Sequence, residues 1–322
     1  MSMNPDEQDS RPELILMGAL PAWDMEPLEA TYRLHKYWEA ADKAAFIAEC
    51  QGVRAMLTKG EIGADAALVA SLPALGMIAN FGVGVDAIDF AATTACGIQV
   101  SNTPDVLTGD VADMAIALAL AVMRDIPRGD RLVRSGGWAR GGLPPARRFF
   151  GCKLGLVGLG RIGLATAERA RGFGCAIGYV NRTAKPGLPY EAFETVAALA
   201  AWCDVLIVTL AGGAGTRAMV DGAALQALGP QGFLVNVSRG STVDEPALLA
   251  ALEGGGIAGA GLDVFWNEPT IDPRFAALDN VVLMPHQGSG TEETRRAMGQ
   301  LVRDNLAAFF AGRPLLTPIS PL

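Results

Sequence analysis

Short apolar runs alternate with helical patterns along the first third of the chain. Strands are predicted at the following runs: Glu13–Met17, Tyr32–His35, Arg54–Leu57, Gly76–Asn80 and Ile98–Ser101. Helical patterns lie between them, near residues 42–50, 64–72 and 88–96. This alternation is typical of a parallel α/β sheet, in which a helix connects one strand to the next.

An extended segment, Asn102–Asp105, separates this region from a long apolar helix. The helix is predicted from about Val106 to Arg124, and its continuation past Pro127 is left open. The longest apolar run, Met114–Met123, lies inside it and is too short to cross a bilayer. We therefore expect a buried helix and no membrane partner.

The second half of the chain repeats the alternation. Strands are predicted at Leu154–Val157, Ala176–Val180, Val205–Thr209, Phe233–Asn236, Gly259–Leu262 and Val281–Met284, and helices near residues 161–172, 191–201, 221–228, 244–253 and 292–311. The proline-rich tail from Pro314 to Leu322 is expected to be extended. The pattern as a whole predicts an α/β protein with two doubly wound parallel sheets.

A glycine-rich turn follows the first strand of this second half and leads into a helical pattern. The turn reads Gly158-Leu-Gly160-Arg161-Ile162-Gly163. In a dinucleotide-binding unit the first glycine makes the tight turn, the second lets the backbone approach a pyrophosphate, and the third lets the helix pack on the strand. A purely structural turn is the alternative. The strand before the motif and the helix after it favour cofactor binding by Gly158, Gly160, Arg161 and Ile162.

The position of this motif bears on the domain organisation. A whole domain must precede it, and 322 residues are enough for two domains. The last helix could cross back onto the first domain and make that domain discontinuous. We expect a substrate domain of residues 1–104 and 291–322 and a dinucleotide-binding domain of residues 105–290.

Charge and cysteine content narrow the functional classes. The net charge is −8 and no basic stripe is visible, which argues against nucleic acid as a partner, so an anionic substrate would need local cations. The five cysteines are scattered and lack CxxC spacing, which predicts reduced thiols in a cytoplasmic protein and no metal site. Residues Met1–Ser10 are acidic and polar, have no signal-peptide character, and are expected to fray.

Polar residues that follow predicted strands are the candidates for chemistry. His286 is one of two histidines and follows an apolar strand, where ligands bind in open α/β sheets. It could act as a general acid or base, or equally hydrogen-bond the nearby backbone. The other, His35, is interpreted as structural.

Arg239 and Glu268 also follow strands. An arginine can hold a carboxylate, and a carboxylate can orient a histidine and raise its pKa. For each residue alone, the alternative is a surface ion-pair partner. Together with His286 they form a coherent catalytic set, and their shared position at strand ends makes that alternative less favoured.

At these residues the chain resembles the D-isomer-specific 2-hydroxyacid dehydrogenases, from about Ala55 to Arg313. The motifs that carry the resemblance are Asn80–Asp89, Gly158–Gly163, Leu234–Gly240, Gly261–Phe265 with Glu268-Pro269, and Pro285-His286. Within the family it is most similar to the glyoxylate/hydroxypyruvate and hydroxyphenylpyruvate reductase branch, through Asn181–Thr183 and Gly136–Gly141. The resemblance implies a Rossmann cofactor domain inserted in a flavodoxin-like substrate domain, with an active-site cleft between them.

The resemblance also implies roles for individual residues. Arg239 would bind and polarise a 2-oxoacid, and His286, paired with Glu268, would protonate its oxo group. The backbone N–H groups of Val83 and Gly84 would hold the substrate carboxylate. A further residue, Asp263, would hold the nicotinamide carboxamide. The family forms dimers through the region that includes the Val106 helix and the arm Ser135–Pro145, so we expect a homodimer.

The segment about twenty residues beyond the glycine turn bears on the choice of cofactor. NAD-specific proteins place an acidic residue there for the ribose 2′-hydroxyl. This chain has Asn181, Arg182 and Thr183 instead, with no acid until Glu191. These three residues suit a 2′-phosphate, so NADP(H) is favoured over NAD(H). The alternative is that Arg182 is an exposed turn residue.

Two other segments are less informative. Leu57 could form an apolar wall of the substrate site and Lys59 a rim charge, and a structural role is as consistent with the sequence for both. Leu210–Ala214 departs from the family, which usually has a Pro-Leu-Thr-like turn there.

We therefore expect an NADPH-dependent reductase of a small 2-oxoacid such as glyoxylate or hydroxypyruvate, with a D-2-hydroxyacid as product. One alternative is an NAD-linked dehydrogenase acting on another D-2-hydroxyacid or on phosphoglycerate. The other is a nucleotide-sensing co-repressor of the same fold.

Overall fold

A computed structural model describes residues 9–319 of the chain. Of the expected frayed segment Met1–Ser10, residues 1–8 lie outside the described residues, as do residues 320–322 of the tail. The chain divides into two compact units. Unit 1 runs to Leu107 and resumes at Thr291, and unit 2 comprises Thr108–Gly290.

Unit 1 is built on a six-stranded sheet in the order β13-β5-β4-β3-β1-β2. Its strands are β1 (Glu13–Leu16), β2 (Arg33–Lys36), β3 (Ala55–Lys59), β4 (Met77–Phe81), β5 (Gln99–Ser101) and β13 (Pro318–Ile319). The first five are parallel in the 2-1-3-4-5 order of flavodoxin-like folds, as predicted for this class. The short β13 pairs antiparallel with β5, so part of the expected extended tail is a sheet edge.

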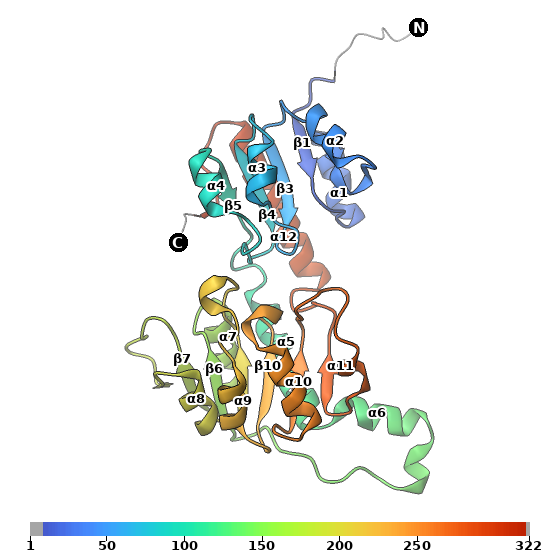
Figure 1. Ribbon diagram of the computed structural model, residues 1–322, viewed down its shortest axis with the longest axis vertical. Coiled ribbons are helices and arrows are strands. Elements are labelled where there is room, and N and C mark those ends of the chain that lie inside the picture. Colours follow the sequence, from blue (N-terminus) through green and yellow to red (C-terminus); the bar gives the residue numbers. More distant parts are fainter. Residues whose placement is uncertain (1–8, 320–322) are drawn as a thin grey trace. The chain divides into compact units, whose positions relative to one another are not determined.

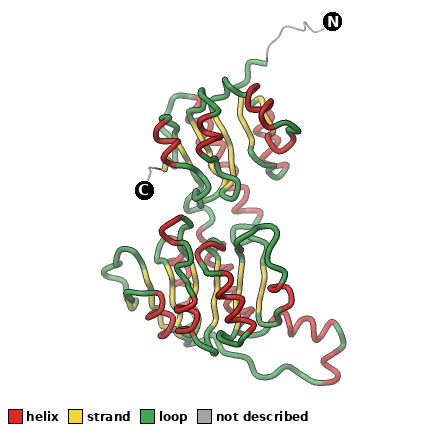
Figure 2. Tube along the Cα trace, in the orientation of Figure 1, coloured by secondary structure: helices red, strands yellow, loops and turns green. Residues whose placement is uncertain are grey.

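Helices cover both faces of this sheet (Figures 1 and 2). They are α1 (Ala22–Thr31), α2 (Lys43–Glu49), α3 (Ala66–Ala70), α4 (Phe90–Ala95) and α12 (Glu292–Phe310), with a short 3-10 turn, η1, at Tyr37–Glu39. Side chains of Asp42, Asp65, Asp89 and Thr291 cap four of them at their N-termini.

Helix α1 was not predicted from the sequence. It contains Pro27 and buries only Asp24 and Leu28, so it lacks the apolar stripe that marks a helix. Tertiary contact explains it, because α1 packs on α12 and the Asp24 carboxylate pairs with Arg303 at 2.5 Å.

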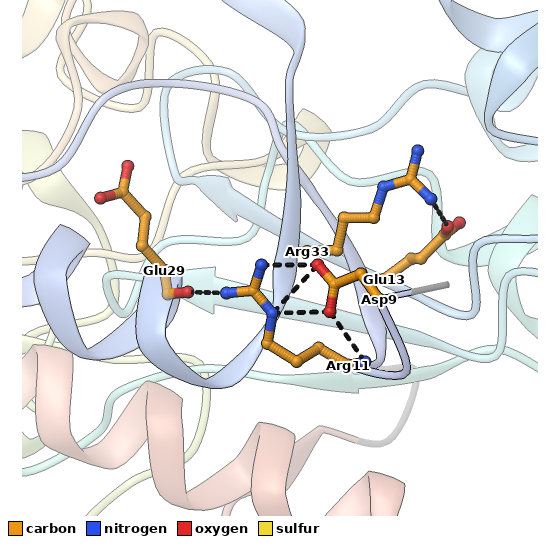
Figure 3. A network of polar contacts seen from close by, with 5 residues as sticks. All are labelled: Asp9, Arg11, Glu13, Glu29 and Arg33. Atoms are coloured by element: carbon orange, nitrogen blue, oxygen red, sulfur yellow. Dashed lines mark hydrogen bonds and ion pairs between the residues drawn. The ribbon is translucent and has the colours of Figure 1, made fainter. Parts of the chain in front are cut away.

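A polar network ties the start of unit 1 together (Figure 3). The Arg11 guanidinium pairs with Asp9 at 2.5 Å and also donates to the Glu29 carbonyl at the end of α1. The hydrogen bonds from Arg11 lower the pKa of Asp9 to about 2. Beside it, Arg33 pairs with Glu13 at 3.0 Å, which joins β2 to β1.

Unit 2 has a seven-stranded sheet in the order β12-β11-β10-β9-β6-β7-β8. Its strands are β6 (Lys153–Val157), β7 (Ala176–Val180), β8 (Glu191–Ala192), β9 (Val205–Val208), β10 (Phe233–Asn236), β11 (Gly259–Leu262) and β12 (Val281–Leu283). All pairings are parallel. Read from β8, this is the doubly wound Rossmann order with one further strand. The order reverses between β6 and β9, which is where such folds bind nucleotides.

Helices of unit 2 lie on both faces of its sheet (Figure 1). They are α5 (Thr108–Met123), α6 (Ile126–Arg134), α7 (Arg161–Gly172), α8 (Val196–Trp202), α9 (Gly222–Leu228), α10 (Glu245–Glu253) and α11 (Arg274–Ala277), with 3-10 turns η2 (Gly137–Arg140), η3 (Ala214–Thr216) and η4 (Gly240–Thr242). Helices α5 and α7 pack together, and α9 packs with α8 and α10.

The sequence left open whether the long helix continues past Pro127, and it does not, because Asp125 adopts φ 55° and separates α5 from α6. One expectation for these helices needs correction. The helix expected from residue 191 begins only at Val196, where Thr195 caps it, and Glu191 instead belongs to β8.

Glycines in the strands allow the close packing of this unit. A Cβ at Gly261 would lie 2.9 Å from the Leu118 side chain of α5, so the helix can approach β11 only because that side chain is absent. On the opposite face, a Cβ at Gly178 of β7 would lie 2.7 Å from the Trp202 ring of α8. Because the helices lie close to the strands, the loops at the carboxyl end of the sheet are held by a rigid core.

Among the described residues, no helix has both the length and the apolar composition that a membrane crossing requires. The same residues include no cluster of three or more side chains suited to a metal ion.

Candidate active site

The glycine turn lies between β6 and α7, at the point where the strand order reverses. Gly158 has φ 98°, a left-handed conformation that favours glycine. A Cβ at Gly163 would lie 2.3 Å from the Gly158 carbonyl oxygen, so the third glycine is required for helix and strand to meet. A Cβ at Gly160, in contrast, would meet nothing within 4 Å. The second glycine therefore leaves open space over the turn, as a pyrophosphate requires.

The first turn of α7 is also suited to an anion. Gly160 is the N-cap of this helix and supplies no side-chain cap. The first amides of a helix have no partner within the helix, and the helix dipole favours negative charge there. The fit of a dinucleotide to this turn therefore rests on its glycines and on the uncapped helix.

Asn181, at the end of β7, supports the turn from the neighbouring strand. Its Oδ1 accepts a hydrogen bond from the Leu159 amide at 3.1 Å, and its Nδ2 donates to the Thr183 carbonyl at 2.7 Å. Arg182 and the Thr183 side chain are exposed beside it. The neighbouring residues of this motif therefore have different roles: Asn181 shapes the loop, whereas Arg182 remains accessible to a ligand.

Arg239 stands just beyond β10, and a network of hydrogen bonds fixes its backbone. Its carbonyl accepts from Asn236 Nδ2 at 2.9 Å and from Thr242 Oγ1 at 2.6 Å. A Cβ at Gly240 would lie 2.0 Å from the Phe265 carbonyl carbon. The loop carrying Arg239 is therefore held directly against the loop that follows β11. Sequence reasoning missed the supporting role of Asn236, although a buried amide that ends an apolar strand was a visible signal.

Glu268 and His286 form a hydrogen-bonded pair. Glu268 Oε2 lies 2.6 Å from His286 Nδ1, and its Oε1 accepts from the Phe265 amide at 2.8 Å. Both carboxylate oxygens are therefore engaged, and the ring orientation of His286 is fixed. Nε2 of the same ring is left as the nitrogen that can exchange a proton with a ligand.

The electrostatics of this pair favour a charged imidazole. The hydrogen bond from Glu268 raises the pKa of His286, against the opposing effects of burial and of the Arg239 charge. Burial raises the pKa of Glu268, but hydrogen bonds with His286 and the Phe265 amide and the charge of Arg239 outweigh it and lower that pKa overall. The sequence predicted that Arg239, Glu268 and His286 belong to one site. In unit 2 the charge of Arg239 acts on the pKa of both Glu268 and His286.

Asp263 organises the loop that carries His286. Its two carboxylate oxygens accept from the amides of Gln287 at 2.7 Å and Gly288 at 2.8 Å, and its carbonyl accepts from the His286 amide at 2.9 Å. His286 itself has φ 53°. Burial raises the pKa of Asp263 despite these backbone hydrogen bonds. This role was not predicted, and the contact with the nicotinamide carboxamide that the resemblance implies for Asp263 stays a prediction.

Within unit 1, the loop with Val83 and Gly84 directly follows β4. Leu57 lies in β3 and is only 1% exposed, so its side chain serves the core and we leave it out of the proposed site. His35 lies 3.4 Å from the Glu13 carboxylate, in keeping with a structural role.

Comparison with known proteins identifies the family. The model of the D-isomer specific 2-hydroxyacid dehydrogenase, NAD binding domain, matches residues 116–288. The chain is 43% identical to a hydroxyphenylpyruvate reductase of Plectranthus scutellarioides, over 95% of this chain and 98% of the relative. It is also 43% identical to a 2-ketogluconate reductase of Gluconobacter oxydans, over 96% and 99% of the two chains.

A solved structure agrees. The NADPH-dependent glyoxylate/hydroxypyruvate reductase of Sinorhizobium meliloti, in complex with NADP and malonate, superposes with a TM-score of 0.91 at 43% identity and covers 97% of both chains. These matches confirm the resemblance of the motifs and the two parallel-sheet domains. The chain therefore belongs to the D-isomer-specific 2-hydroxyacid dehydrogenase family and is an NAD(P)-dependent oxidoreductase of that family.

Proposed function

We propose that this protein uses NADPH to reduce a small 2-oxoacid to the D-2-hydroxyacid, with His286 as the general acid. The observation that carries the proposal is the 2.6 Å pair of Glu268 and His286, with the charge of Arg239 acting on both. A histidine whose pKa is raised keeps its proton to higher pH than a free imidazole, and the reduction of an oxo group consumes a proton.

The three side chains divide the work of the reaction. Arg239 binds the substrate and polarises its oxo group, and His286 Nε2 delivers a proton to the oxygen as negative charge develops there. Glu268 keeps the ring oriented and stabilises its protonated form. When bound, the nicotinamide would supply the hydride. The amides of Val83 and Gly84 hold the substrate carboxylate, in the manner of a backbone anion nest.

The relatives indicate the substrate class. The names hydroxyphenylpyruvate reductase, 2-ketogluconate reductase and glyoxylate/hydroxypyruvate reductase have a 2-oxoacid in common and differ in the group attached to it. The shared part is what Arg239 and a carboxylate nest would recognise. Glyoxylate and hydroxypyruvate are our first candidates because a 2-oxoacid with a small attached group needs little room beyond this shared part.

The end of β7 supports a preference for NADP(H). An acidic side chain at this position would repel a 2′-phosphate, and the chain has the neutral Asn181. The exposed Arg182 adds a positive charge next to it, and Lys185 lies in the same loop, held through its amide by the Tyr179 hydroxyl at 3.0 Å. NAD(H) remains the weaker alternative.

The test is a panel of 2-oxoacids with both cofactors, followed by the loss of nicotinamide absorbance. Glyoxylate or hydroxypyruvate should be reduced with NADPH at a kcat/KM at least about tenfold above that with NADH. A factor of ten corresponds to about 1.4 kcal/mol, which is about the free energy that one charge-assisted hydrogen bond contributes. No turnover of any 2-oxoacid with either cofactor would refute the proposal, and chiral analysis of the product checks the D configuration.

We also propose that the protein is a homodimer joined through the region of α6 and the arm that follows. The large apolar side chains Ile126, Val133 and Trp138 are 53%, 58% and 66% exposed, which is typical of an interaction surface. Light scattering should give twice the mass of the 33.5 kDa chain. Val133→Asp should shift that mass toward the monomer, and a wild-type protein of monomer mass would contradict the proposal.

A cytoplasmic location is proposed on the cysteines. The Sγ atoms of Cys152 and Cys175 lie 3.6 Å apart as free thiols, and all five cysteines are free. Reduced thiols are typical of that compartment. A thiol titration of protein from its native source would contradict this location if it found disulfides.

A further inference from the structure

The loop after β4 turns its carbonyl groups toward the protein. Asn80, the fourth residue of β4, is fully buried, and its Nδ2 donates to the carbonyls of Gly82 at 3.0 Å and Gly84 at 2.9 Å. Between them, the Val83 carbonyl accepts from Asn102 Nδ2 at 3.0 Å. Two amide side chains therefore engage the carbonyls of three successive residues.

A third residue closes the loop at its start. The Gly82 amide donates to Thr103 Oγ1 at 3.2 Å, and the Thr103 amide donates back to the Gly82 carbonyl at 3.1 Å. Gly82 has φ 140°, which few other residues adopt. The loop is thus held by side chains from β4 and from the segment after β5.

These contacts determine where the amides point. In a trans peptide the N–H of one residue points opposite to the C=O of the residue before it. Holding the Gly82 carbonyl inward therefore turns the Val83 N–H outward, and holding the Val83 carbonyl inward does the same for the Gly84 N–H. Consecutive N–H groups aimed to one side form a nest for an anion such as a carboxylate.

Asn102 is in turn held by the last helix and the segment that follows it. Thr317 Oγ1 donates to the Asn102 carbonyl at 2.6 Å and accepts from Asn305 Nδ2 at 3.0 Å. Asn305 is fully buried in α12, and its Oδ1 accepts from the amides of Leu316 and Thr317 at 3.0 and 3.1 Å. A continuous polar chain therefore runs from α12 through Thr317 and Asn102 to the Val83 carbonyl.

Asn80 also shows that stability alone does not explain this arrangement. Within the described part of the chain its Oδ1 is buried and has no hydrogen-bond partner, which costs free energy. The opposite amide orientation would bring Oδ1 against two carbonyl oxygens, so the orientation is determined by the loop it holds.

We infer that Asn80 and Asn102 are positioning residues that orient the Val83 and Gly84 amides toward the substrate carboxylate, and that Thr317 and Asn305 hold Asn102 in place. The inference rests on the proposed function, because it assumes that the ligand of this loop is the carboxylate of a 2-oxoacid. It adds residues that themselves do not touch the substrate.

The test compares Asn102→Ala and Thr317→Val with the wild-type enzyme. Asn102→Ala should raise the KM for glyoxylate and the inhibition constant of malonate about tenfold, and Thr317→Val should raise both about threefold, in line with one lost or loosened hydrogen bond. The KM for NADPH should stay unchanged. Because both residues are half-buried and neither belongs to the hydrophobic core, both variants should fold, and a melting curve checks this.

Gln51→Ala is the matched control. Gln51 Nε2 also donates to two carbonyls in unit 1, those of Ile47 at 2.9 Å and Ser71 at 2.8 Å, but these lie outside the loop. This variant should lose a comparable pair of hydrogen bonds from a side-chain amide. It should keep the wild-type KM for glyoxylate and the wild-type inhibition constant of malonate.

The outcomes separate the two proposals. If wild-type enzyme reduces glyoxylate and the Asn102→Ala constants for glyoxylate and malonate do not change, the inference is wrong and the proposed function stands. Equal rises in the KM for glyoxylate and for NADPH, or an equal effect of Gln51→Ala, would also overturn the inference. A wild-type enzyme that neither reduces any 2-oxoacid nor binds malonate would overturn both.

Discussion

The two units each present a loop suited to an anion, and they build it in different ways. In unit 2 the loop runs into α7, whose uncapped N-terminus supplies amides and a favourable dipole. In unit 1 the loop after β4 does not lead directly into a helix. Its peptide groups are instead oriented by hydrogen bonds with the side chains of Asn80, Asn102 and Thr103. The first device is local, whereas the second depends on contacts across the unit.

This difference teaches which sites tolerate change in distant parts of the chain. The glycine turn is held by its own glycines and by one side chain from each neighbouring strand end: Asn181 accepts from the Leu159 amide, and Thr209 Oγ1 donates to the Gly158 carbonyl at 2.7 Å. The unit 1 loop depends on Asn305, which follows it by more than two hundred positions in the sequence. Its geometry should therefore respond to substitutions that leave the cofactor turn unaffected.

The largest expected effect is on turnover, and it should leave ligand binding at both loops unchanged. His286→Ala removes the proton donor and should lower kcat for 2-oxoacid reduction by about a hundredfold or more. Binding of NADPH and of malonate, measured by calorimetry, should survive, because neither loop includes His286. Unchanged turnover would remove His286 from the mechanism.

A second substitution attacks the cofactor turn alone. A Cβ at Gly163 would lie 2.3 Å from the Gly158 oxygen, so Gly163→Ala should force the turn and α7 apart. Overpacking of this kind costs about 1–3 kcal/mol, and we expect a lower melting temperature with weaker NADPH binding. Gly172→Ala in the same helix, where a Cβ meets nothing within 4 Å, is the control. Equal behaviour of the two variants would contradict the turn geometry.

The smallest of these effects concerns the selectivity of the same turn. Arg182→Ala should weaken NADPH binding about tenfold, as the loss of one charge-assisted hydrogen bond predicts, and leave NADH binding nearly unchanged. Fluorescence titration with both nucleotides measures the ratio. Equal losses of NADPH and NADH affinity would show that Arg182 does not contact the 2′-phosphate. Arg182 would then be an exposed turn residue, which is the alternative that the sequence also allowed.

The sequence predicted most of the cofactor unit because its signals are local. An apolar strand, the glycines at 158, 160 and 163 and the helix that follows are adjacent in the chain, and a helix N-terminus needs no distant partner. Strand ends were predicted to within a residue in β6, β7, β10 and β11, whose runs are apolar and bounded by turns. Arg239, Glu268 and His286 could be proposed as catalytic residues because each follows an apolar strand that the sequence predicted, β10, β11 and β12 respectively.

What escaped prediction depends on tertiary contact. Helix α1 forms despite Pro27 because Asp24 pairs with Arg303. The spacing of apolar residues along the chain does not indicate such a pair. The same holds for Asp263, whose carboxylate holds two amides 24 and 25 positions away. Hydrogen bonds between segments distant in sequence leave no pattern along the chain.

The dependence of kcat/KM on pH tests the central claim most directly, namely that Glu268 keeps His286 protonated as the general acid. The pKa of His286 is raised in the folded protein, so reduction should be fast below that pKa and fall as pH rises through it. In Glu268→Gln the raising partner is lost, and the fall should move to lower pH, by about one unit if the pair contributes about 1.4 kcal/mol. An alkaline limb at the same pH in both proteins would contradict the account.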